Sequence, residues 1–200
     1  MKLFYSPASP YARKVVIAAS ELGIALEVEK VGVSPIADNP QMTAANPLGK
    51  IPTLVLKDGT TLHDSRVITD YFDSLTPRSL IAQSGAERYR VLTETSIADG
   101  LLDAALLVRY EAAMRPEALR WPEWIAGQMG KIRRALDAFE TAPRHHAQGL
   151  TIADIAVACG LGYLDFRFPE ETWREGRPRL AAFHAAFAQR PDWVSSDPAI

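Results

Sequence analysis

The pattern of strand and helix signals changes once along this 200-residue chain, near residue 80. Before that point, short strand-like runs alternate with helical repeats, and after it no convincing strand follows. The stretch Thr76 to Gly85 is rich in Pro, Ser and Gly, as linkers are. We therefore predict an α/β domain over residues 1–77, followed by an all-α domain over residues 84–200.

The first part has the order strand, helix, strand, helix, strand, strand, helix. The predicted strands cover 2–5, 26–31, 53–56 and 61–62; the helices run from residue 11 to Gly23, within 35–45, and from residue 64. Gly23 supplies a left-handed helix end, and Asp58-Gly59 is a hairpin signal. Such βαβ and ββα units build a mixed sheet with helices on its faces. Arg13 and Lys14, one turn into the first helix, are predicted to be exposed.

The second part consists of helical repeats only. Apolar residues recur at helical spacing over 86–114, 121–142, 151–168 and 179–188, and the last helix stops before Pro191. The third of these helices is apolar on all sides, so we expect it in the core. Thr151 and Asp154 form a capping box at its start, which is a structural role. The polar stretch Pro143 to Leu150 is predicted to be exposed.

Composition excludes several functions. With 22 Lys and Arg against 24 Asp and Glu, the chain offers no broad attraction to nucleic acid or to a membrane surface. There is no apolar run of membrane-spanning length, no secretory signal pattern and no phosphate-binding glycine motif, which favours a cytoplasmic protein. The only cysteine, Cys159, cannot form an internal disulfide and is predicted to be buried packing. The four histidines lack metal-ligand spacing, so we expect no metal.

Ser9-Pro10 stands between the first strand and the first helix, and it has two interpretations. Ser is a good N-cap, and Pro is favoured at the first helical position. The same helix end carries partial positive charge and unpaired N–H groups, so it would stabilise a bound thiolate to which the Ser9 hydroxyl donates. The two roles conflict in part, because a hydroxyl that serves a ligand is less free to cap.

Two further stretches suggest a ligand site. In Asn46-Pro-Leu-Gly-Lys-Ile-Pro-Thr, Pro52 leads into a strand and is a candidate cis proline, which would turn the Ile51 backbone outward to pair with a peptide. An ordinary loop is the alternative. Asp64-Ser65 begins the next helix. Asp64 is either the N-cap alone or, with Ser65, a binding site for the carboxylate and ammonium groups of a ligand.

Taken together and in this order, these motifs resemble the glutathione S-transferases. The resemblance spans nearly the whole chain, through Ser-Pro at the first helix, NPLGKIPTL, HDSRVITDYF, SIADGLLDAALLVRYE and TIADIAVACGLGYLDF. The first domain is similar to thioredoxin-fold proteins, and the serine-type bacterial enzymes, the nu-like or YibF-like group, match best. Because Tyr5 falls within the predicted strand, we favour Ser9 over it as the catalytic residue.

The resemblance implies a role for each matched position. Ser9 would hydrogen-bond the glutathione sulfur, Ile51 would pair with the cysteinyl part ahead of Pro52, and Lys50 would lie near the glycyl carboxylate. Asp64 and Ser65 would hold the γ-glutamyl group. In related enzymes an acidic residue of the partner subunit approaches the γ-glutamyl ammonium; Asp99 is the first candidate here and Asp103 the second.

The resemblance also implies a homodimer that uses glutathione as co-substrate and attacks a small, hydrophobic electrophile. The pocket for this second substrate is expected between the domains, lined by Tyr11, Arg109, Tyr110 and Phe166. Two alternatives stay open. One is a non-catalytic adaptor of the stringent starvation type, and the other is a glutathione-dependent peroxidase or reductase.

Overall fold

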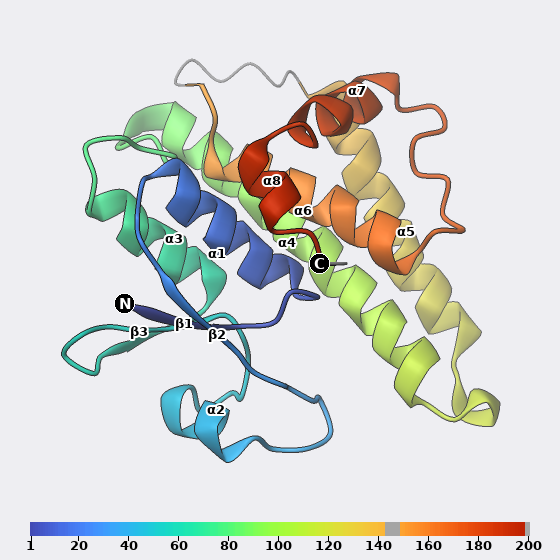
Figure 1. Ribbon diagram of the computed structural model, residues 1–200. Helices are drawn as coiled ribbons and strands as arrows, with labels where there is room; N and C mark the ends of the chain where they lie inside the picture. Colours follow the sequence, from blue (N-terminus) through green and yellow to red (C-terminus); the bar gives the residue numbers. More distant parts are fainter. Residues whose placement is uncertain (143–148, 199–200) are drawn as a thin grey trace.

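The computed structural model describes residues 1–142 and 149–198 (Figure 1). The prediction that Pro143 to Leu150 is exposed therefore falls largely outside the described residues; Gly149 is exposed and Leu150 is half-buried. The first part holds β1 (Lys2–Tyr5), α1 (Pro10–Glu21), β2 (Glu27–Lys30), α2 (Pro40–Ala45), β3 (Thr53–Val55), β4 (Thr61–Leu62) and α3 (Ser65–Ser74). The second holds α4 (Gly85–Met114), the short 3-10 helix η1 (Glu117–Leu119), α5 (Pro122–Thr141), α6 (Ile152–Arg167), α7 (Pro178–Phe187) and α8 (Pro191–Ser195).

The four strands form one mixed sheet in the order β2-β1-β3-β4. β1 runs parallel to β2 and antiparallel to β3, and β3 runs antiparallel to β4. Successive side chains point to opposite faces, so Leu3 packs with the core under α1 and α3, whereas Phe4 packs with Met42 of α2 on the other side. The predicted fold class, a thioredoxin-like α/β domain followed by an all-α domain, is confirmed.

This topology brings three chain segments to one end of the sheet. Phe4 near the end of β1 pairs with Thr53 at the start of β3, and Leu54 pairs with Leu62 at the end of β4. The loop that leaves β1, the loop that enters β3 and the loop that leaves β4 therefore lie side by side. These are the segments that carry Ser9, Ile51-Pro52 and Asp64-Ser65.

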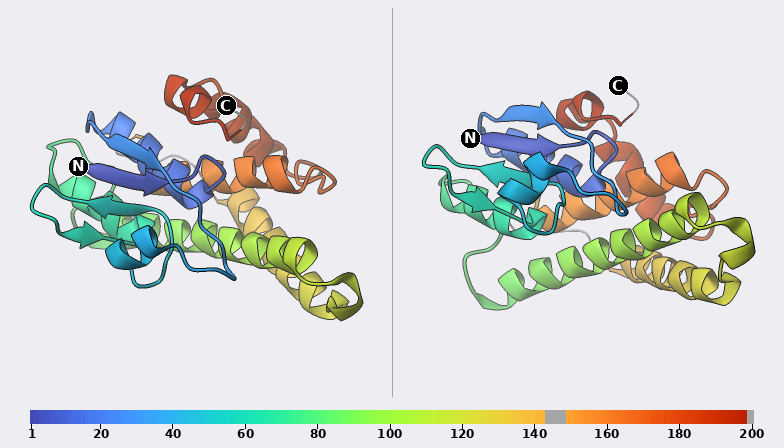
Figure 2. Two further views of the ribbon diagram at one scale, coloured as in Figure 1. Left: turned by 60° about the horizontal axis from the view of Figure 1, so that its bottom comes forward. Right: turned by 90° about the horizontal axis from the view of Figure 1, so that it is seen from below.

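The helical part packs around α6. This helix contacts both α4 and α1, and residues 152–164 are all buried, as its apolar sequence predicts. The capping box is confirmed: Asp154 N–H donates to Thr151 Oγ1 over 3.3 Å, and Thr151 N–H donates to Asp154 Oδ2 over 3.0 Å. α4 and α5 lie side by side along the molecule and meet at η1 (Figure 2).

One sequence prediction is wrong, and two predicted elements form with features that the sequence did not indicate. Arg13 and Lys14 are buried instead of exposed, because α1 contacts α3, α6 and α8 and has little surface left for solvent. The strand over 26–31 forms, but β2 lies at the edge of the sheet and its Val28 is 49% exposed. The predicted helix over 179–188 forms as α7 and stops before Pro191. That proline then begins a further helix, α8, which the sequence analysis did not predict, because proline suits a first helical position.

Candidate functional site

Ser9 caps α1. Its side chain accepts a hydrogen bond from Ala12 N–H over 3.2 Å, and Pro10 takes the first helical position. The residue is half-buried, at the end of the loop that leaves β1. A serine hydroxyl has one donor and two acceptor sites, so accepting from Ala12 leaves its proton free to donate elsewhere. Capping and hydrogen bonding to a ligand are therefore compatible, contrary to the partial conflict expected from the sequence.

The loop before β3 contains the expected cis proline. The Ile51–Pro52 peptide is cis, as is the non-proline peptide His63–Asp64. Ile51 lies just before Thr53, the first residue of β3, which pairs with Phe4 of β1, so it lies at this end of the sheet. Lys50 is exposed beside it.

Asn46 organises this loop, and sequence reasoning gave it no role. Its buried amide donates to Lys50 O over 3.0 Å and to Thr53 Oγ1 over 3.2 Å, while its Oδ1 accepts from Leu48 N–H over 3.0 Å. An Asn whose side chain bonds the backbone two residues on is a turn signal that the sequence does contain.

Asp64 caps α3, with Ser65 buried directly behind it. Asp64 Oδ1 accepts from Arg66 N–H over 2.9 Å, and Oδ2 accepts from the Arg66 guanidinium over 3.1 Å. Partial burial opposes ionisation of Asp64, but the Arg66 side chain, the Arg66 backbone N–H and the charge of Lys14 outweigh it and lower the pKa of Asp64. The carboxylate is therefore ionised at neutral pH and suited to face an ammonium group.

A buried ion pair joins α1 to α4 next to these groups. Lys14 is fully buried, and its Nζ lies 2.6 Å from Oδ1 of Asp99, which is 5% exposed. Arg66 Nε lies 3.8 Å from the other Asp99 oxygen. Burial raises the pKa of Asp99, and the charge of Lys14 opposes that rise. Nearby, the Tyr11 hydroxyl donates to Asp103, which is exposed.

These groups form a coherent site at the end of the sheet. Two helix N-termini, those of α1 and α3, open toward it, and each presents N–H groups and the positive end of a helix dipole to an anion. The Ile51 backbone lies between the segments that bear them. The arrangement suits an extended, peptide-like ligand with a carboxylate at one end and a thiolate near Ser9.

Comparisons with known proteins agree with this geometry. Residues 3–80 match the family model of the glutathione S-transferase N-terminal domain, and residues 122–186 match that of the C-terminal domain. The chain belongs to the glutathione S-transferase family. The uncharacterised GST-like protein YibF of Escherichia coli K12 is 32% identical over 202 residues, which cover 99% of this chain and 98% of YibF.

Two crystal structures from Pseudomonas fluorescens Pf-5 resemble this family member throughout. One, of a glutathione transferase family member with bound glutathione, has a TM-score of 0.96 and 44% identity and covers 100% of this chain and 99% of its own. The other contains S-(propanoic acid)-glutathione, with a TM-score of 0.91, 44% identity and 98% of both chains covered. The expectation of a bacterial member of this family is confirmed.

A narrow cavity of about 10 Å³ lies between the loop after β1 and the last turns of α6. At that volume it admits about one water molecule. Its lining is Pro7, Ala8, Pro10, Arg13, Cys159, Gly162, Tyr163, Phe166 and Pro198. Of the residues predicted for the second substrate, only Phe166 lines it; Tyr11, Arg109 and Tyr110 are half-buried outside it. Tyr163 also lines this cavity, although its place in a uniformly apolar helix gave no reason to select it from the sequence.

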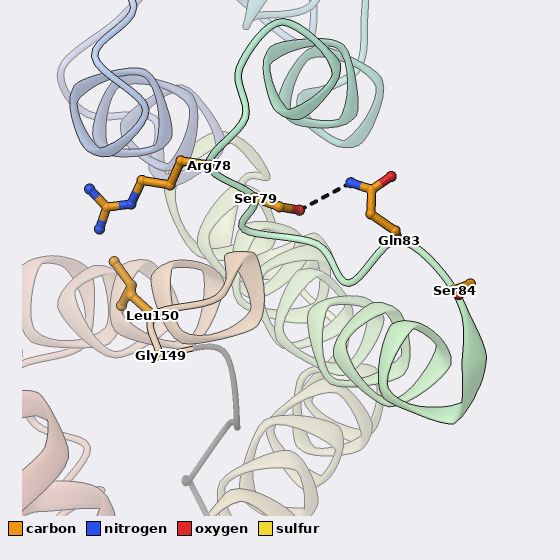
Figure 3. Close-up of a pocket in the computed structure, with 6 residues that line it drawn as sticks. All are labelled: Arg78, Ser79, Gln83, Ser84, Gly149 and Leu150. Atoms are coloured by element: carbon orange, nitrogen blue, oxygen red, sulfur yellow. Dashed lines mark hydrogen bonds between the residues drawn. The ribbon is translucent and has the colours of Figure 1, made fainter.

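A larger hollow lies elsewhere, at the linker between α3 and α4 (Figure 3). It is lined by Arg78, Ser79, Gln83, Ser84, Gly149 and Leu150. The Arg78 guanidinium binds Glu21, and Gln83 donates to Ser79 over 3.3 Å, so its polar groups already bind one another or their neighbours. In the described parts of the chain, no three His, Cys, Asp or Glu side chains gather as a metal site requires, and no helix could span a bilayer.

Cys159 is buried in α6, as expected, and burial raises the pKa of its thiol to about 12. Because the thiolate is the reactive form, we expect the native protein to react with a disulfide reagent such as DTNB at pH 7.5 at least about a hundredfold more slowly than the unfolded protein. Release of one thiol equivalent, followed by absorbance with and without denaturant, measures this. Rapid labelling of native protein would contradict it.

Proposed function

We propose that this family member is a glutathione transferase that binds glutathione along the end of the sheet and directs its sulfur at a small electrophile. The observation that supports the proposal best is the place of Ser9. Its hydroxyl caps α1 and keeps a donor free, at the same sheet end as Ile51-Pro52 and Asp64-Ser65. The Pseudomonas structure with bound glutathione, at 44% identity over the full chain, supports the same ligand.

The chemistry that we propose needs no metal and no covalent enzyme intermediate. A free thiol titrates near pH 8.5, and the α1 dipole together with the Ser9 O–H favours its ionised form. The thiol proton passes to water. The sulfur then forms a bond to the electrophilic carbon, and the leaving group departs with the electron pair of the bond that breaks.

The remaining groups bind the tripeptide in this proposal. Asp64 accepts from the γ-glutamyl ammonium, and Ser65 at the start of α3 binds the γ-glutamyl carboxylate. The Ile51 backbone pairs with the cysteinyl residue, and Lys50 lies near the glycyl carboxylate. The second substrate lies beside the sulfur, where the other Pseudomonas structure carries a propanoic acid group on glutathione.

We keep the cytoplasmic homodimer within the proposal. An acidic group of the partner subunit would complete the γ-glutamyl site. Asp103 is better suited than Asp99, because it is exposed whereas Asp99 is buried against Lys14.

Replacing Asp64 by Asn (D64N) tests the site directly. Asn caps a helix as well as Asp, so the substitution removes the charge and keeps the cap. A hydrogen bond to a charged group contributes about 1.5–3 kcal/mol, and we therefore expect glutathione to bind about tenfold more weakly in calorimetric titration. The control is D58N, which changes a turn aspartate at the opposite end of the β3–β4 hairpin.

The outcomes separate the possible functions. If calorimetric titration of the wild-type protein with glutathione gave no heat of binding, the proposal would be overturned and an adaptor would be favoured. Equal affinities of D64N and wild type would overturn the role of Asp64. Turnover of an organic hydroperoxide without turnover of an alkylating electrophile would replace conjugation by peroxidase chemistry.

A further inference from the structure

The C-terminal segment, residues 190–198, runs along α1 and ends beside the loop that carries Ser9. Arg190 forms an ion pair with Glu21, the last residue of α1. α8 then contacts α1, next to which it lies in the ribbon (Figure 1). Pro198 lines the narrow cavity together with the loop after β1. The segment therefore reaches both ends of α1, including the end at the candidate site.

Arg13 is the residue of α1 that fixes this segment in place. Its guanidinium carbon lies 3.5 Å from the ring centroid of Trp193. Its Nη2 donates to Trp193 O over 2.8 Å, and its Nε donates to Ser196 Oγ over 3.2 Å. Its backbone N–H donates to Ser9 O over 3.0 Å in the first turn of the helix. One buried residue thus joins the Ser9 carbonyl to the C-terminal segment.

α6 makes room for this contact at Gly162. A Cβ at that position would lie 2.6 Å from Cη2 of Trp193 and 3.3 Å from Nη1 of Arg13. Carbon atoms in favourable contact are about 3.5–4.0 Å apart, so a side chain here would displace the indole ring. Arg13, Gly162 and Trp193 therefore form one close-packed unit, which we call the Arg13 clamp.

A buried guanidinium is a costly way to hold two helices together. Burial lowers the pKa of Arg13, which reflects the cost of taking its charge out of water. An apolar side chain would pack on Trp193 without that cost. The guanidinium adds direction instead, because its planar set of N–H donors holds the Trp193 carbonyl and the Ser196 hydroxyl in fixed places. This rigid connection lies one helical turn from Ser9.

We infer that Arg13 is a positioning residue for the proposed reaction: it fixes the first turn of α1 to the C-terminal segment and so aims the Ser9 hydroxyl at the bound sulfur. This role rests on the proposed function. Arg13 touches neither substrate, and its effect reaches the sulfur only through Ser9.

The pKa of the thiol of bound glutathione tests this role without any second substrate. A thiolate absorbs in the ultraviolet where a thiol does not, so a pH titration of the complex measures this pKa. Replacing Ser9 by Ala (S9A) should raise it by about 1, because the hydrogen bond to the charged sulfur is lost. R13Q should raise it by about 0.5 to 1, because the hydroxyl is misplaced instead of removed. Calorimetric titration should show that both variants still bind glutathione.

A double variant shows whether Arg13 acts through Ser9. In the S9A background, R13Q should change the pKa of the bound thiol by less than about 0.3, because no hydroxyl is left to position. A direct effect of the Arg13 charge on the sulfur would instead persist in the double variant. That result would overturn the inference.

G162A tests the Arg13 clamp from α6 and keeps the charge of Arg13. It should raise the pKa of the bound thiol as R13Q does. G162A/W193F should restore the pKa in part, because phenylalanine lacks the outer ring atoms that the new Cβ would meet. The matched control is G127A in α5, where the glycine is exposed and an added Cβ meets nothing within 4 Å.

The results separate this role from the proposed function. A raised pKa in S9A, with wild-type values in R13Q and G162A, would overturn the role of Arg13 and leave the transferase proposal intact. Variants that lose thermal stability but keep the wild-type pKa of the bound thiol would overturn it too. If R13Q did not fold, G162A and S9A/G162A would complete the same comparison. Failure of the wild-type protein to bind glutathione would overturn the proposed function itself.

Discussion

Replacing Ser9 by Ala (S9A) is expected to lower kcat/KM for conjugation by between about tenfold and a hundredfold. The hydroxyl that we assign to the sulfur is worth about 1.5–3 kcal/mol as a hydrogen bond to a charged atom, and about 1.36 kcal/mol is a factor of ten in rate. Affinity for glutathione should change little, because we assign most of the tripeptide contacts to Ile51 and Asp64-Ser65. Steady-state kinetics and calorimetric titration measure the two effects.

S9A also removes the N-cap of α1, at a cost of about 1 kcal/mol of stability. S9T keeps both the hydroxyl and the cap, so it should retain most of the activity. The pH profile gives a further readout, since S9A should shift the activity rise to higher pH as the bound thiol becomes harder to ionise. Wild-type rates in S9A would remove Ser9 from the mechanism.

Replacing Lys14 by Met (K14M) is expected to destabilise the protein by about 3 kcal/mol at pH 7, which for a chain of this size lowers Tm by about 6–12 °C. The cause is the buried carboxylate that the substitution leaves behind. Lys14 is fully buried against Asp99, and Arg66 at 3.8 Å offers only partial compensation. Thermal and urea denaturation measure the loss.

Two controls identify the ion pair as the cause. K14M/D99L removes both charges and should recover most of the stability, because an apolar pair avoids the cost of burying an ion. Lowering the pH should stabilise K14M relative to the wild type. A carboxyl whose folded pKa is raised binds its proton more tightly in the native state than in the unfolded state. Above the ordinary pKa of about 3.9, the stability of the protein therefore falls as the pH rises through the folded pKa.

The deficit of K14M relative to the wild type should therefore shrink as the pH falls from 7 toward 5. A deficit that is constant over this range, or a double variant no more stable than K14M, would show that lost packing is responsible.

Local signals in the sequence predicted most of the elements, together with the helix starts and the cis proline at the candidate site. Ser9-Pro10, Asp64 and the Thr151–Asp154 box mark helix starts because capping bonds reach only two or three residues along the chain. The cis peptide before Pro52 was also predicted from a local signal, a proline that leads directly into a strand. Asn46 was missed although its turn chemistry is local, because the prolines and glycine around it already suggested a loop.

Long-range placement was beyond the sequence. Arg13 and Lys14, one turn into the first helix, were predicted to be exposed, and nothing in the sequence indicated that α8 would cover Arg13. The guanidinium carbon of Arg13 lies 3.5 Å from the Trp193 ring centroid, across 180 positions of sequence. The local pattern of residues 26–31 likewise did not contain the edge position of β2, which leaves Val28 exposed.

By itself, the sequence determined the order of strands and helices, the change to an all-helical half and the caps that begin its principal helices, since each depends on spacing and on bonds between near neighbours. Only the tertiary structure decided which charges are buried together. Lys14 and Asp99 come from segments 85 positions apart. Their energies depend on burial and on distance through space, which a one-dimensional pattern does not contain.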